Sequence, residues 1–253
     1  NNNIYNLKLL LGVKMLSRRL KKIMGFPIRK YLYAAYKFEE QTKSLIETQK
    51  ELLLSKIRKN SETEYGKRYD FSSIQSIKQF QESVPLINYN DISESIEKIK
   101  NGEKNVLTKQ SPIKFVTTSG TSGEPKFIPV TQDFLEEYTN SWNIWITYAV
   151  NEHRRIPLGK VLSFISPPIE GYTKSGIPYG SMTGLTQESQ HFISKMFYAV
   201  PKEVFNIPNL KKRQYTTLRL SLEKNVSMLN TANPSTINII CQLGDELKQE
   251  LIE

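Results

Sequence analysis

The sequence predicts an α/β fold in which mixed sheets are flanked by helices. Short apolar runs typical of strands alternate along the chain with segments whose apolar residues recur at helical spacing. The chain has 253 residues, of which 38% are hydrophobic and 24% are charged. These values are typical of a globular protein with a real core, organised as one large domain or two small ones.

The first predicted helix, residues 4–25, is basic and amphipathic. Its apolar stripe consists of Leu9, Val13, Leu16, Leu20 and Ile23. Residues 1–60 hold 14 Lys or Arg and 4 Asp or Glu, and the rest of the chain holds 21 of each, so the net charge of +10 lies entirely in this segment. Such a helix can bind an anionic membrane surface, but we favour packing of its stripe on the body. We therefore expect a basic helical segment, 1–60, that packs on a neutral domain, 61–253.

The segments before the central hairpin predict three further elements. Residues 37–59 favour a helix, and residues 63–66 favour a turn. Residues 70–73 resemble a helix entry, which leads into a helix over 74–82 with Phe80 as its anchor in the core.

A short helix and a hairpin are expected next. Asp91 or Ser93 can cap a helix that carries Ile92, Ile96 and Ile99, and Asn101-Gly102 can end it. A strand–loop–strand hairpin follows at 112–130. The next helix begins after Thr131, its expected N-cap. Its apolar stripe, which we assign to core packing, consists of Phe134, Tyr138, Trp142, Trp145 and Ala149.

The remaining segments continue the alternation of strands and helices. Residues 160–168 predict a buried strand. The Gly-rich segment 171–184 that follows is either a functional loop or a plain long one. Residues 211–222 predict a helix, and residues 227–233 predict a strand that leads into a turn. The last helix opens at Pro234 and carries Ile239, Leu243 and Leu247.

Cysteine and histidine are too scarce for several kinds of site. Cys241 is the only cysteine, so an internal disulfide is excluded and a reducing, cytoplasmic location is expected. A small buried apolar residue is the favoured interpretation of Cys241. With only His153 and His191 present, we expect no protein-based metal site. The neutral body argues against a nucleic-acid-binding domain, and no apolar run approaches the length of a membrane span.

The segment 115–131 is the most informative part of the chain. Between its apolar flanks lie four hydroxyl residues and two glycines, which are Thr118, Ser119, Gly120, Thr121, Ser122 and Gly123. Lys126 follows them. Glycines let the backbone amides approach a ligand and form a concavity for anions, and a lysine suits a phosphate. The alternative is a Ser/Gly-rich surface turn without a ligand. The loop is not a Walker A motif, because Pro125 precedes the lysine and Phe127 follows it.

Around this loop the chain resembles the auxin-responsive Gretchen Hagen family of acyl-acid amido synthetases, a branch of the adenylate-forming ligases. The central match is the segment 118–123 followed by Lys126 and Pro129. Further matching segments lie at 49–66, 80–89, 102–108 and 171–184. The fold that the resemblance implies is the N-terminal portion of the large domain of an adenylate-forming enzyme. Family members are much longer, so we expect a fragment that holds an incomplete adenylation domain.

The resemblance also implies a reaction. ATP, with Mg²⁺, and a small carboxylic acid form an acyl-adenylate, and an amine such as an amino acid then attacks it. Residues 117–126 would form the phosphate-binding loop, with the cofactor-binding residues Thr118, Ser119, Gly120, Thr121, Ser122, Gly123 and Lys126. Lys126 would also be catalytic, since it would stabilise charge on the leaving pyrophosphate. Two alternatives stay open: a catalytically incomplete module that uses the helix 4–25 at a membrane surface or partner, and a phosphate-loop NTPase of another fold.

Overall fold

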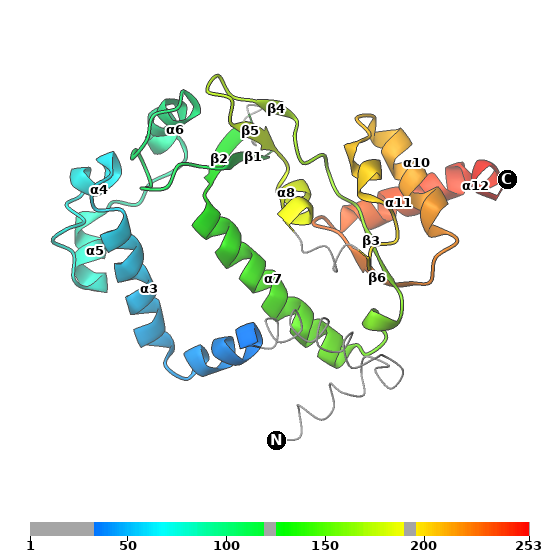
Figure 1. The fold of residues 1–253 in the computed structure, drawn as a ribbon, viewed down its shortest axis with the longest axis horizontal. Helices are drawn as coiled ribbons and strands as arrows, with labels where there is room; N and C mark the ends of the chain where they lie inside the picture. Colours follow the sequence, from blue (N-terminus) through cyan, green and yellow to red (C-terminus); the bar gives the residue numbers. More distant parts are fainter. Residues whose placement is uncertain (1–32, 119–124, 190–195, 253) are drawn as a thin grey trace, which may run out of the picture. The chain divides into compact units, whose positions relative to one another are not determined.

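The protein is represented by a computed structural model (Figure 1). The residues that it describes are 33–118, 125–189 and 196–252. The chain divides into two compact units. The hairpin unit is built from Tyr36–Asn140 and Ile169–Met182, and the C-terminal unit includes Ser141–Pro168 and Thr183–Glu253. The predicted α/β class is confirmed, because the described residues combine helices with a four-stranded mixed sheet and a two-stranded parallel sheet. The predicted helix 4–25 lies outside the described residues.

The sheet of the hairpin unit has the strand order β2-β1-β5-β4. Strand β1 (Lys114–Thr118) pairs with β2 (Lys126–Val130) in antiparallel register, which confirms the predicted strand–loop–strand. On its other side β1 pairs in parallel with β5 (Pro178–Gly180), which in turn pairs antiparallel with β4 (Gly171–Tyr172). The central strand β1 is therefore covered on both edges, and the mixed sheet is built around it.

The Gly-rich segment 171–184 is not the loop that was expected. It forms the β4–β5 hairpin and then the start of α8 (Met182–Ser189). The hairpin turn closes where the N–H of Thr173 donates to the carbonyl of Ile177 at 2.9 Å. Gly176 has φ +84 within this turn, a conformation that glycine adopts without strain. The glycines here allow a tight turn between two strands. Because turns and long loops are both rich in glycine, composition alone suggested a loop.

Several helices precede the hairpin in the described part of the chain. They are α3 (Leu45–Lys59), α4 (Glu64–Arg68), α5 (Ile77–Ser83), η2 (Asn90–Ile92) and α6 (Ser93–Lys100). Residues 33–42 are also helical, so the helix predicted over 37–59 is interrupted by a turn at 43–44. The expected end of α6 is confirmed, since Asn101 is its C-cap and Gly102 follows with φ +98.

Two local sequence predictions are wrong, one of a turn and one of a helix entry. The expected turn at 63–66 is the start of α4, because the buried Thr63 hydroxyl caps that helix by accepting from the N–H of Gly66 at 2.9 Å. The expected helix entry at 70–73 is a turn, in which Asp70 has φ +46. Helix α5 is capped by Ser76 instead.

The hairpin unit contains two clusters of buried side chains. The first consists of Leu54, Ile57, Phe71 and Ile74. Phe80 packs against this cluster, as predicted. The second consists of Ile96, Ile99, Val106 and Phe115. Phe115 is fully buried and belongs to β1, so the central strand is anchored in the second cluster.

The long helix α7 (Gln132–Glu152) follows β2, and the Thr131 hydroxyl caps it by accepting from the N–H of Phe134 at 3.3 Å. Its aromatic stripe was assigned to the core, and this is wrong for Phe134 and Trp145, whereas Tyr138, Trp142 and Ala149 are half-buried. Phe134 is 43% exposed and Trp145 is 46% exposed, whereas Leu135 is buried. An apolar stripe predicts an apolar face, but it does not predict that another element covers that face.

The C-terminal unit is built around the parallel pair β3 (Lys160–Ser163) and β6 (Val226–Asn230). Its other elements are η3 (Ile156–Leu158), α8, η4 (Lys202–Asn206), α10 (Leu210–Ser221), α11 (Ser235–Glu246) and α12 (Lys248–Ile252). The core consists of Leu162, Ala199, Val200, Val204 and Phe205. The strand predicted over 160–168 is shorter than expected, because β3 ends at Ser163.

Helix α11 buries a different face from the one expected. Ile240 and Leu243 are buried, whereas Ile239 is 49% exposed and Cys241 is exposed. Because successive helical residues are rotated by about 100°, Cys241 points away from the face shared by Ile240 and Leu243. The buried position assigned to the cysteine is therefore wrong. Within the described ranges, every helix is too short or too polar to traverse a membrane.

Candidate functional site

The open end of the β1–β2 hairpin brings two of the predicted site residues together. Thr118 and Lys126 are Cα partners in the antiparallel register, and they are the last pair before the connecting loop. The loop residues lie outside the described residues; they are Ser119, Gly120, Thr121, Ser122 and Gly123. An exposed hydroxyl therefore ends one strand and a lysine begins the next, on either side of the Ser/Gly-rich connection.

Lys126 is half-buried at the start of the edge strand β2. Its ammonium lies 5.5 Å from the centroid of the Tyr89 ring, within the range of a cation–π interaction. No acidic side chain in the described part of the chain forms an ion pair with it. The charge of Lys126 is thus oriented by an aromatic face rather than neutralised by a carboxylate.

Tyr89 also holds the backbone of the next residue, Phe127. Its hydroxyl accepts from the Phe127 N–H at 2.9 Å and lies 3.5 Å from the Phe127 carbonyl oxygen, to which it donates. Both groups belong to the outer edge of β2, where no strand satisfies them. The sequence prediction missed this residue, although an aromatic residue after the extended link at 84–86 was a signal for contact with the sheet.

The Phe127 ring is packed from three sides. It makes edge contacts with Phe115 and Tyr179, with ring centroids 6.1 Å and 5.2 Å away. The ammonium of Lys100 lies 4.2 Å from the centroid of its ring. The first two residues of β2 are therefore held in place by Tyr89, which precedes η2, and by residues of α6, β1 and β5. The backbone that carries Lys126 is fixed by these contacts.

Glu170 is a second residue that sequence reasoning missed. Its carboxylate accepts from the Thr117 hydroxyl at 3.3 Å, and its N–H donates to the Tyr179 carbonyl at 2.8 Å. A carboxylate oxygen therefore lies beside β1, one residue before Thr118. Among the described residues, no three His, Cys, Asp or Glu side chains gather as a metal-binding group.

Comparison with solved structures identifies the fold. The fold is similar to that of GH3.15 acyl acid amido synthetase, with a TM-score of 0.76 at 23% identity over 86% of this chain and 39% of that one. The structure of AtGH3.15 acyl acid amido synthetase in complex with 2,4-DB matches with a TM-score of 0.77, again at 23% identity and over 87% and 39% of the two chains. The fold of this chain is thus similar to part of the fold of these two structures.

Sequence comparison identifies the family. Residues 34–253 match the model of the GH3 family N-terminal domain, so the chain belongs to the GH3 family. Indole-3-acetic acid-amido synthetase GH3.3 of Arabidopsis thaliana is 27% identical over 79% of this chain and 35% of its own length. 4-Substituted benzoates-glutamate ligase GH3.12 of the same plant is 27% identical over 78% and 36%. Jasmonoyl--L-amino acid synthetase JAR6 of Nicotiana attenuata is 28% identical over 63% and 28%.

These matches confirm the family that the motifs predicted. The chain spans about a third of the length of the curated relatives that it matches. The resemblance to the Gretchen Hagen family is therefore correct, and it applies to the N-terminal part of such proteins. The roles of the seven predicted site residues stay predictions.

Proposed function

We propose that the protein to which this chain belongs activates a carboxylic acid with ATP and transfers the acyl group to an amine. The observation that carries this proposal is the hairpin, which sets Thr118 opposite Lys126 on either side of a loop rich in hydroxyls and glycine. The names of three relatives support this proposal: an indole-3-acetic acid-amido synthetase, a 4-substituted benzoates-glutamate ligase and a jasmonoyl--L-amino acid synthetase. A small acid and an amino acid are thus the proposed substrates.

The proposed chemistry assigns a role to each part of the loop. Amides at Gly120 and Gly123 and hydroxyls at Thr118, Ser119, Thr121 and Ser122 would hold the phosphates of ATP. An oxygen of the acid attacks the α-phosphorus, and the bond to the β-phosphate oxygen breaks. Lys126 would stabilise the charge that develops on the departing pyrophosphate. The amine then attacks the acyl carbon, AMP leaves, and the amine proton passes to solvent.

The structure fits phosphate at this position, because Lys126 is a cation without an acidic partner among the described residues and is braced by Tyr89. Mg²⁺ commonly binds proteins through one or two carboxylates together with phosphate oxygens, and Glu170 offers one carboxylate beside Thr117, near the end of β1. The division into segments 1–60 and 61–253 and the cytoplasmic location stay predictions. The alternative role at a membrane surface rests on residues 4–25, which are not described.

Removal of the Lys126 charge tests the proposal. In the complete protein, Lys126→Ala should lower acid-dependent exchange of pyrophosphate into ATP by about 10²-fold or more, the scale of losing one transition-state donor. Lys174→Ala is the matched control, since Lys174 is exposed in the β4–β5 turn. Exchange that is unchanged in Lys126→Ala would remove this lysine from the mechanism. An exchange activity that does not depend on any acid would overturn the proposed reaction.

A further inference from the structure

Lys100, the last residue of α6, contacts two separate parts of the sheet in the hairpin unit. Its ammonium lies 4.2 Å from the centroid of the Phe127 ring, on the edge strand β2. Its carbonyl oxygen accepts from the Ser175 hydroxyl at 2.9 Å and from the N–H of the same serine at 3.4 Å. Ser175 lies in the turn between β4 and β5, and β1 separates these strands from β2. The end of α6 is therefore joined to both sides of the central strand.

The backbone of Lys100 is fixed on the β4–β5 turn. The last carbonyls of a helix have no partner within the helix, and Ser175 supplies one here. The turn has its own support, because the Thr173 hydroxyl lies 3.1 Å from the Ser175 hydroxyl and accepts from the N–H of Ile177 at 3.1 Å. A Cβ at Gly102 would lie 3.2 Å from the Cβ of Ser175, so the glycine allows this close approach. The side chain of Lys100 thus extends from a defined point.

The side chain of Lys100 is also held in one direction. The Glu97 carboxylate, one helical turn earlier, accepts from its ammonium at 2.6 Å. The Lys100 side chain is 22% exposed, whereas that of Glu97 is 61% exposed. A cation–π interaction is stronger when the cation is partly removed from water. The contact between Lys100 and the Phe127 ring is therefore the better-shielded part of this arrangement.

The contact with Phe127 bears on Lys126, the residue before it. Successive residues of a strand point to opposite faces of the sheet. Phe127 therefore anchors β2 on the face that α6 covers, and Lys126 points to the other face. A residue that holds the Phe127 ring can influence Lys126 only through the backbone that the two residues share.

We propose that Lys100 is a positioning residue for Lys126 in the formation of the acyl-adenylate. This inference rests on the proposed function, which places Lys126 at the phosphates of ATP. Lys100 holds Phe127 against the end of α6, and the β4–β5 turn holds Lys100, so the start of β2 keeps one position. Small displacements of a catalytic group are costly to the rate, which is why a contact on the opposite face matters for the reaction.

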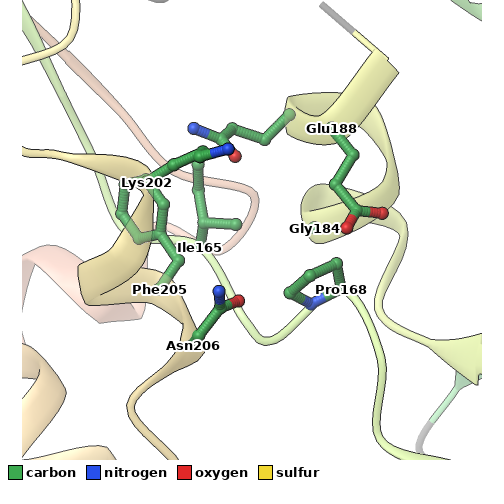
Figure 2. Close-up of a pocket in the computed structure, with 8 residues that line it drawn as sticks. Ile165, Pro168, Gly184, Glu188, Lys202, Phe205 and Asn206 are labelled. Atoms are coloured by element: carbon green, nitrogen blue, oxygen red, sulfur yellow. The ribbon is translucent and has the colours of Figure 1, made fainter.

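Amide exchange of the complete protein without ligands tests the contact itself. Lys100→Met keeps an unbranched side chain and removes the charge. Exchange over residues 125–131 should rise by about 2–5-fold, the ratio equivalent to a cation–π interaction worth about 0.5–1 kcal/mol. Lys98→Met is the matched control, since Lys98 lies on the same helix and pairs with Glu64 at 2.8 Å. Lys202→Met removes a charge in the other unit, where Lys202 borders a cavity lined by residues of α8 and η4 (Figure 2). Unchanged exchange in Lys100→Met would overturn the proposal.

Acid-dependent exchange of pyrophosphate into ATP tests the role in the reaction. Lys100→Met should lower it by at least about 5-fold. Lys100→Arg should restore it to within about 2-fold of the native rate, because a guanidinium also stacks on aromatic faces. Lys98→Met should leave it unchanged. In the Lys126→Ala background, Lys100→Met should cause no further loss, since residues that act through one another are not additive.

The outcomes separate this inference from the proposed function. A loss of the same size with and without Lys126 would show that Lys100 acts on the fold alone, and the inference would be wrong. Native activity in Lys100→Met would also overturn it and leave the proposed function intact. Absence of acid-dependent exchange in the native protein would instead refute the proposed function, and the catalytic role of Lys100 with it.

Discussion

A single hydroxyl, that of Tyr89, satisfies both backbone groups of Phe127 on an otherwise open strand edge. Edge strands expose a row of unpaired N–H and C=O groups, which proteins usually protect. The same ring lies under the ammonium of Lys126. Tyr89 is thus a positioning residue in the proposed site, since it fixes the backbone from which the lysine projects.

Tyr89→Phe should loosen β2 and leave the aromatic face in place. Losing hydrogen bonds with a net value of about 1 kcal/mol should raise amide exchange at the start of β2 by about 5-fold. Hydrogen exchange with mass spectrometry over residues 125–131 measures this effect. Tyr172→Phe is the control, because Tyr172 is 63% exposed. If exchange in β2 does not change, the hydroxyl has no positioning role.

At the scale of elements, charged side chains join the end of α3 to the start of α7 within the hairpin unit. Lys56 pairs with Glu137 at 2.7 Å, and Lys59 pairs with Asp133. Asp133 also accepts from the side-chain amide of Gln110 at 2.7 Å. The hydrogen bond from Lys59 lowers the pKa of Asp133 below its usual value, and the amide contributes further in the same direction.

This pKa gives stability a defined pH dependence. Folding lowers the pKa of this carboxyl below its value in the unfolded chain, near 3.8. The ionised carboxylate therefore stabilises the folded state at pH values above 3.8, and this contribution is lost as the pH falls through the pKa of the folded state. Asp133→Asn should therefore reduce stability by about 0.5–1 kcal/mol at neutral pH, the scale of an exposed pair, and the difference from the native protein should diminish as the pH falls below about 3.8. Urea unfolding at pH 7 and pH 3 measures it.

The control for this experiment is Glu152→Gln, which removes a negative charge at the other end of α7. We expect it to change stability by less than about 0.5 kcal/mol. A difference between Asp133→Asn and the native protein that persists undiminished at the lowest pH would show that the ion pair is not its cause.

At the scale of the whole molecule, each unit has cores of its own. Ile96, 1% exposed, lies in the hairpin unit, and Phe205 lies in the C-terminal unit. Ile96→Ala should cost about 2–5 kcal/mol and should speed amide exchange over α6 and β1 without affecting residues 199–205. Phe205→Ala should produce the reverse pattern. Equal acceleration in both units for either variant would show that they open together.

Local chemistry accounts for what could be predicted from the sequence. The hairpin, the Thr131 cap and the glycine at the end of α6 follow from neighbours along the chain, and all three are confirmed. The burial of Trp145 and Cys241 depends on which element covers which helical face, a long-range property that periodicity does not contain. Tyr89 was missed for the same reason, because it meets Phe127 from 38 positions away.

The candidate site was predictable to a lesser extent. Its family and its location on a strand–loop–strand follow from the residue types at 115–131, and the comparisons bear out the family. Tyr89 contacts Lys126, and residues of α6 and β5 contact the neighbouring Phe127; these contacts arise only in three dimensions. A motif therefore identified the family, whereas the packing around the hairpin required the structure.

The parallel pairing of β1 with β5 has a consequence for the newly made chain. Val116 pairs with Gly180, 64 positions later in the chain, and the intervening residues include the stretch Ser141–Pro168, which belongs to the other unit. At a synthesis rate of about 5–20 residues per second, this partner arrives about 3–13 s after β1. During that interval one edge of β1 has no neighbour from its own sheet, so the nascent hairpin unit passes through a stage open to strand pairing with other chains and to binding by chaperones.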